Sequence, residues 1–250
     1  ELAALLGLLG LFFTARYAAL ARGIAAAPLG VGGPQTDLQS GLAIYRFVGV
    51  LFYASLAALV AADDMHVLGI QMWLLRGVRR PKLLLIRLLL MLLCGWLLTI
   101  AATLGSIGEG ALARMIFAGA SRVTSVPWAV ILAATLAVFW GAVPYMAVTF
   151  LLAVACRSAL TGVGGTLVFR SILENGLLRL VGRVPALVRL LPVQLAGALE
   201  HSVPGMHLPV EAHPQGLYLT SPQAALVIAA MLFVSGVLSI MIFRRQDWGG

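Results

Sequence analysis

The sequence predicts an all-α polytopic membrane protein with six transmembrane helices and both termini in the cytoplasm. Three observations support this fold class: hydrophobic residues make up 61% of the 250 residues, charged residues make up 10%, and apolar runs recur along the whole chain. Soluble domains contain roughly 25% charged residues, so a mean hydropathy of +1.02 excludes that class. The net charge of +8 is better explained by cations that meet anionic headgroups at span ends than by nucleic-acid binding.

Six segments satisfy the requirement of about 20 mostly apolar residues for a membrane-spanning helix. In chain order they are residues 2–21, 41–62, 83–103, 128–156, 159–180 and 223–243. Pro144 lies inside the fourth segment, where a kink is expected because proline removes a helical hydrogen bond. We treat residues 1–250 as one transmembrane domain. We also expect a short piece to precede Glu1, because the chain opens there without Met.

The connections between the spans are predicted to be mostly irregular. Residues 28–40 are rich in Gly and Pro, and residues 181–222 contain six prolines, so a long outer loop is expected in the latter. Residues 105–127 are expected to form only a short amphipathic helix at 111–117. Five basic residues lie within 76–87, beside span ends. The positive-inside rule therefore places this connection and both termini in the cytoplasm.

Residues 63–82, between the second and third spans, interrupt the apolar sequence with ordered charges. One apolar stripe recurs at spacings of three and four, as on a helix face: Met65, Leu68, Met72 and Leu75. Trp73 borders this stripe. Two acids at the start, Asp63 and Asp64, and basic residues at the end complement a helix dipole, and Pro81 is expected to end the helix. From this pattern alone, the helix either lies passively in the headgroup layer or docks a soluble partner.

This segment and three later motifs resemble the ABC-2 family of ABC-transporter permeases. The first motif is Asp63 or Asp64, then Gly69, then Trp73-Leu74-Leu75-Arg76-Gly77-Val78-Arg79-Arg80 before a Leu-rich span. The later motifs are Cys156-Arg157-Ser158 before Gly162, Gly164 and Gly165; Glu174 before Leu191-Pro192; and Phe243-Arg244-Arg245-Gln246-Asp247. The chain departs from the family in three ways. Members often have Glu where Asp63 or Asp64 stands, and Thr where Ile70 follows Gly69. They also have a cytoplasmic lead-in before the first span, which we expect to belong to the piece before Glu1.

The resemblance implies the permease subunit of an ATP-driven transporter in the bacterial cytoplasmic membrane, more an exporter than an importer. It implies a dimer with a second permease copy or homologue, and a separate cytoplasmic ATPase subunit that binds ATP and Mg²⁺. The chain has no G-x-x-x-x-G-K-[ST] motif, and its only lysine is Lys82. We therefore expect no enzymatic activity and no cofactor in this chain, and membrane lipid but no nucleic acid among its partners.

Within this resemblance, residues 63–82 form a coupling helix whose apolar stripe inserts into a groove on the ATPase, while flanking charges set its orientation. Arg157, in the turn before the fifth span, would face the same partner. The implied ATPase-coupling residues are Asp63, Asp64, Met65, Leu68, Gly69, Met72, Trp73, Leu75, Arg76, Arg79, Arg80 and Arg157.

Charged residues inside the fifth span are the strongest candidates for a transport path, because ionisable groups are costly within a bilayer. They are Arg170, Glu174 and Arg179. The functional interpretation is that they line a polar path or a short re-entrant segment. The structural alternative is that Arg170 and Glu174 neutralise each other as an i,i+4 pair.

His201, His207 and His213, with Glu200 and Glu211, are potential metal ligands in the outer loop. Their spacing of six matches no usual ligand pair, so no metal site is predicted. An alternative function is a non-transporting anchor subunit of a multi-subunit redox complex, docked through residues 63–82, although the spans lack paired histidines for haem. A third is an intramembrane enzyme that uses Glu174 with the outer histidines.

Overall fold

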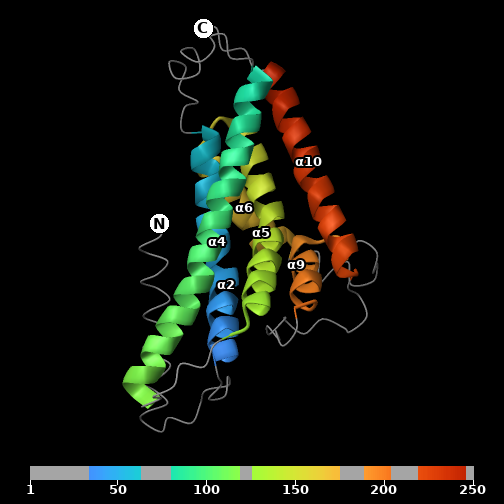
Figure 1. Cartoon of the computed structure of the whole chain (residues 1–250). Helices are drawn as coiled ribbons and strands as arrows, with labels where there is room; N and C mark the ends of the chain where they lie inside the picture. Colours follow the sequence, from blue (N-terminus) through green and yellow to red (C-terminus); the bar gives the residue numbers. More distant parts are fainter. Residues whose placement is uncertain (1–33, 63–79, 119–125, 175–188, 204–218, 246–250) are drawn as a thin grey trace. The chain divides into compact units, whose positions relative to one another are not determined.

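The computed structural model describes residues 34–62, 80–118, 126–174, 189–203 and 219–245, and every regular element in these ranges is helical (Figure 1). The expected all-α class is confirmed for this part of the chain. The elements are α2 (Pro34–Ala62), α4 (Arg80–Ala118), α5 (Trp128–Cys156), α6 (Ala159–Val168), the π-helix η1 (Phe169–Glu174), α9 (Pro192–Glu200) and α10 (Ser221–Arg245).

Three of these helices are long and apolar enough to cross a membrane: Pro81–Leu112, Trp128–Cys156 and Ser221–Arg245. They contain the third, fourth and sixth predicted spans, and α5 has the predicted bounds of 128–156. The second and fifth predicted spans, 41–62 and 159–180, overlap in part with two shorter apolar helices, Val48–Ala62 and Ala159–Ile172. The first predicted span, 2–21, lies outside the described residues.

The predicted break after the third span is wrong, because α4 continues without interruption to Ala118. The polar residues of this region stay inside the helix by hydrogen bonding to its own backbone. Thr103 Oγ1 donates to the Thr99 carbonyl at 2.9 Å, and Ser106 Oγ donates to the Ala102 carbonyl at 2.7 Å. Such back-bonding removes the need for another partner. A separate amphipathic helix at 111–117 is therefore also wrong.

The predicted outer loop 181–222 contains a helix, α9, that the run of prolines concealed. Pro192 is the first residue of α9, where a missing N–H costs no helical hydrogen bond. The next turn closes on Leu191, whose carbonyl accepts from Gln194 N at 2.9 Å and Leu195 N at 3.0 Å. α9 packs on α5 through small residues, since a Cβ built on Gly141 would lie only 2.8 Å from Ala196 Cβ. Proline thus starts a packed helix here.

Internal contacts divide the chain into two compact units. Unit 1 comprises Glu1–Gly49, Leu97–Val138 and Glu200–Ala212, and unit 2 comprises Val50–Trp96, Phe139–Leu199 and His213–Gly250. In unit 1, Thr135 Oγ1 donates to Thr103 Oγ1 at 3.2 Å between α5 and α4. In unit 2, the rings of Trp96 and Phe139 meet edge to face at 5.1 Å. Both units therefore join α4 to α5, each through its own contact.

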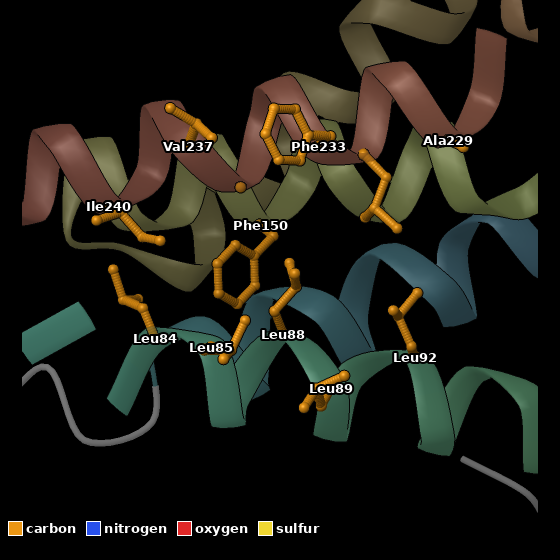
Figure 2. A pocket seen from close by; sticks show the side chains of 12 residues that line it. Leu84, Leu85, Leu88, Leu89, Leu92, Phe150, Ala229, Phe233, Val237 and Ile240 are labelled. Atoms are coloured by element: carbon orange, nitrogen blue, oxygen red, sulfur yellow. The ribbon is translucent and has the colours of Figure 1, made fainter. Parts of the chain in front are cut away.

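Helices α5 and α10 both run antiparallel to α4 within unit 2, so that several helix ends meet at one place. Phe139 of α5 contacts Trp96, whereas Phe150 lies beside Leu84 and Leu88, so α5 runs opposite to α4. Ile240 of α10 lies beside Leu84 (Figure 2). The start of α4, the end of α5 and the end of α10 therefore share one end of unit 2, and the end of α2 joins them through a contact described below. We call this the basic end, because Lys82, Arg157, Arg244 and Arg245 are exposed there.

Candidate functional site

Residues 63–79 of the predicted coupling segment 63–82 fall outside the described residues, but Arg80 and the helices on either side of this stretch do not. The residues outside the description are Asp63, Asp64, Met65, Leu68, Gly69, Met72, Trp73, Leu75, Arg76 and Arg79. Helix α2 ends at Ala62 and helix α4 begins at Arg80. Pro81 lies in the first turn of α4, a position that suits proline because its fixed φ is already helical.

Arg87 joins the two helix ends that flank the coupling segment. Its guanidinium Nη1 donates to the carbonyl oxygen of Ala61 at 2.9 Å, and the side chain is only 8% exposed. Ala61 lies in the last turn of α2, where carbonyls have no helical partner and carry partial negative charge. The contact is therefore a charge-assisted cap that ties α2 to the second turn of α4. From the sequence, Arg87 was only one of five clustered cations.

The turn between α5 and α6 is short and backbone-strained at one residue. Arg157 has φ 52, the left-handed region that favours glycine, directly after α5 ends at Cys156. Ser158 N donates back to the Ala153 carbonyl at 3.2 Å, which closes the helix end in the Schellman pattern. Ser158 then caps α6, because its Oγ accepts from Thr161 N at 3.3 Å. Arg157 keeps an exposed side chain at the basic end at the expense of about 1 kcal/mol or more of strain.

α6 folds back along α5 at very close range. A Cβ on Gly162 would lie 2.9 Å from Ala153 Cβ and 3.0 Å from the Thr149 carbonyl oxygen, so only glycine fits. The buried hydroxyls of Thr149 and Thr166 are 2.7 Å apart across this contact. Each also lies within hydrogen-bond distance of a carbonyl of its own helix, Tyr145 O and Gly162 O respectively. Small residues and hydroxyl pairs of this kind hold helices together in lipid.

Arg170, the first residue of the candidate transport path, lies in the π-helix that follows α6. Its guanidinium carbon is 5.5 Å from the centroid of the Tyr145 ring, and Tyr145 is buried on α5. The cation therefore faces protein, in an attractive arrangement with the ring. Glu174 is the last residue of η1, but its side chain lies outside the description, as does Arg179, so the expected pairing of Arg170 with Glu174 stays a prediction.

Sequence reasoning missed one further ionisable group in a candidate span. Glu109 lies in α4 within Pro81–Leu112, because the helix continues where a loop was expected. Its Oε2 is buried and has no hydrogen-bond partner among the described residues. An intramembrane carboxylate is a functional candidate by default. The Gly-Glu-Gly context concealed it by resembling a turn.

The potential metal ligands of the outer region are mostly outside the described part of the chain. His201 follows α9 and is exposed, and Glu200 is buried at the end of that helix. His207, Glu211 and His213 lie outside the description. Among the described residues, no group of three or more His, Cys, Asp or Glu side chains could hold a metal ion.

Comparison with known proteins places the chain in a family without naming its activity. No curated protein and no solved structure matches it. One family model, described as Protein of unknown function (DUF2705), matches residues 14–249, which is nearly the whole chain. The chain belongs to the DUF2705 family.

Proposed function

We propose that this chain is the transmembrane permease subunit of an ATP-driven ABC transporter, coupled to a separate cytoplasmic ATPase through residues 63–82. The proposed form has six spans with both termini in the cytoplasm of a bacterial cell, works as a dimer and exports its substrate. The observation that carries the proposal is the contact between Arg87 and Ala61. It ties together the two helices from which the coupling segment emerges.

This contact supports coupling for a mechanical reason. A partner that moves residues 63–79 pulls on the end of α2 and the start of α4 at once. Because the buried Arg87 guanidinium links these helices at 2.9 Å, they move together rather than apart. Packed helices respond to such a push as rigid bodies. The displacement is then passed to α5, since α4 packs on it through Gly95 and Met146.

The turn between α5 and α6 supports a second point of contact with the same partner. Arg157 is exposed at the basic end of unit 2, together with the start of α4. Its left-handed backbone would be relieved by glycine, yet arginine is present. Strain retained at an exposed charged residue is a typical sign of function. The basic end is also the expected cytoplasmic side by the positive-inside rule.

The proposal is tested by copurification of the full-length chain from its native membranes with substitutions on the two faces of the coupling segment. Leu68→Asp places a charge in the apolar stripe and is expected to release an ATP-hydrolysing partner. His66→Asp introduces the same residue off the stripe and is expected to retain it. Equal recovery of the ATPase with both variants, or copurification of a haem protein with no ATPase, contradicts the proposal.

Arg87→Met separates docking from transmission. Methionine keeps most of the buried volume but removes the donor to Ala61. We expect the ATPase to copurify as with the unsubstituted chain, while substrate-stimulated ATP hydrolysis falls about tenfold, an effect of roughly 1.4 kcal/mol. Arg87→Lys keeps the charge and is expected to restore part of the stimulation. Full stimulation in Arg87→Met would show that this contact transmits nothing.

A further inference from the structure

A groove of about 350 Å³ lies between α4 and α10 in unit 2, and all twelve residues that line it are apolar (Figure 2). α4 contributes five leucines from Leu84 to Leu92, α10 contributes six residues of one face, and α5 contributes Phe150. Phe150 is 1% exposed and forms the floor, whereas Phe233 on the rim is 72% exposed. The groove is therefore open along one side, and its volume lies within the range of about 300–1,000 Å³ of ligand pockets.

The groove has the length of one leaflet of a bilayer. Leu84 lies eight residues before Leu92 in α4, a rise of about 12 Å, and Ala229 lies eleven residues before Ile240 in α10, a rise of about 16 Å. The hydrocarbon core of a bilayer is about 30 Å thick, so one leaflet is about 15 Å deep. A single extended acyl chain that enters at one end would therefore fill the groove.

Among the described residues of α4 and α10, the exposed cations all lie at one end of the groove. Lys82 lies two residues before Leu84, and Arg244 and Arg245 follow Ile240 by four and five residues. Because α4 begins where α10 ends, the three exposed residues lie at the same end of the groove. Arg and Lys donate charge-assisted hydrogen bonds to phosphate oxygens. An apolar groove with cations at one end is complementary to a lipid with an apolar acyl chain and an anionic headgroup.

We propose that this groove is a binding site for an anionic phospholipid, with one acyl chain between α4 and α10 and the headgroup phosphate on Lys82, Arg244 and Arg245. The site does not depend on the transporter function proposed above. A second copy of this chain is the less suitable occupant. If it packed here about an axis along the membrane normal, the two cationic ends would meet at the same depth and repel each other.

The test is native mass spectrometry of the full-length chain titrated with dioleoyl phosphatidylglycerol or with dioleoyl phosphatidylcholine. We expect one phosphatidylglycerol molecule to bind with a dissociation constant about tenfold lower than that of phosphatidylcholine. The reason is that each basic residue near an anionic headgroup adds electrostatic attraction. The triple variant Lys82→Gln, Arg244→Gln and Arg245→Gln is expected to bind both lipids equally. The matched variant Lys82→Arg, Arg244→Lys and Arg245→Lys keeps the charges and should keep the preference.

A second pair of variants tests the groove without touching the cations. Gly236→Leu fills the groove from α10, and we expect it to abolish the preference. Gly108→Leu adds the same side chain to α4 where nothing lies within 4 Å of the glycine, and should bind as the unsubstituted chain does. Gly236→Ala, which meets Leu88 at an ordinary 3.7 Å, keeps the fold and should weaken binding partly.

Three outcomes overturn the proposal. Equal binding of both lipids to the unsubstituted chain would mean only unspecific lipid contact. A preference that survives the glutamine triple variant or Gly236→Leu would place the anionic lipid elsewhere. Efficient disulfide cross-linking of Leu89→Cys between two copies, without retained lipid, would show that a second copy covers the groove, since Leu89 lines it.

Discussion

Helices α5 and α10 have nearly the same length and are both apolar, yet they occupy opposite environments. The most apolar window of α5 is 72% buried in the protein, whereas that of α10 is 17% buried. The buried window of α5 is the less hydropathic of these two windows. It carries Gly141, Tyr145 and Thr149, which contact other helices. In lipid, small and polar residues therefore mark the protein-facing helix, because apolar side chains gain little by leaving lipid tails.

The difference in burial between α5 and α10 is tested first by truncating one large apolar side chain on each helix to alanine. Met146→Ala on α5 removes a fully buried side chain that touches α4 at Gly95, and we expect it to lower the free energy of unfolding by about 3 kcal/mol. Leu226→Ala on α10 removes a side chain that is 71% exposed, with an expected change below about 0.5 kcal/mol. Unfolding in mixed detergent micelles measures both. Equal effects would mean that α10 is packed against protein.

The second prediction sharpens the comparison at the closest contact of α5. Gly162→Ala places a methyl group against Ala153 and the backbone of Thr149, neither of which moves easily. We expect a loss of about 2 kcal/mol in the free energy of unfolding. Gly164→Ala is the matched control on the same helix, because nothing lies within 4 Å of that glycine. It should be neutral or gain up to about 1 kcal/mol from better helix propensity.

If the two alanine variants behave alike, the contact between α6 and α5 does not limit stability. If Gly164→Ala alone is destabilising, the exposed face of α6 is covered by a partner of the assembled protein. Both variants are compared by the same unfolding measurement. The expected loss for Met146→Ala is argued separately, from the contact of Met146 with Gly95 of α4.

The sequence located the apolar spans well where bilayer thickness alone sets the length. Residues 128–156 were predicted with the bounds that α5 has, and 223–243 lies inside α10. The prediction failed where polar residues or prolines suggested an interruption. Thr103 and Ser106 keep α4 continuous by bonding to its own carbonyls, and Pro192 starts a helix rather than a loop. These outcomes depend on local hydrogen bonds that composition does not reveal.

The candidate site was predictable only in part, because one sequence does not state which helices touch. The basic cluster of 76–87 was evident, but the role of Arg87 depends on the position of the Ala61 carbonyl, 26 residues away. The close contact at Gly162 likewise depends on Ala153 of another helix. A signal was present for Arg87, since an arginine inside an apolar span must face protein or water. The sequence does not say, however, which group of the protein Arg87 contacts.

The C-terminal ends of α5 and α10 also differ, and a substitution there is expected to change the free energy of unfolding least. α10 ends in two exposed arginines, whereas α5 ends in Arg157 with φ 52 and a tight turn into α6. Arg157→Gly relieves the left-handed strain, so we expect the free energy of unfolding to rise by about 1 kcal/mol. We expect ATP hydrolysis coupled to the chain to fall at the same time, because the cation that faces the proposed partner is lost.

Opposite signs in stability and coupling distinguish a functional residue from a structural one. Arg157→Lys keeps both the strain and the charge, so its unfolding free energy and its coupling should stay close to those of the unsubstituted chain. A gain in stability with unchanged coupling in Arg157→Gly would show that the turn is only a connection. A loss of stability would show instead that the arginine side chain holds the turn, and the strain would then be offset by contacts within this chain.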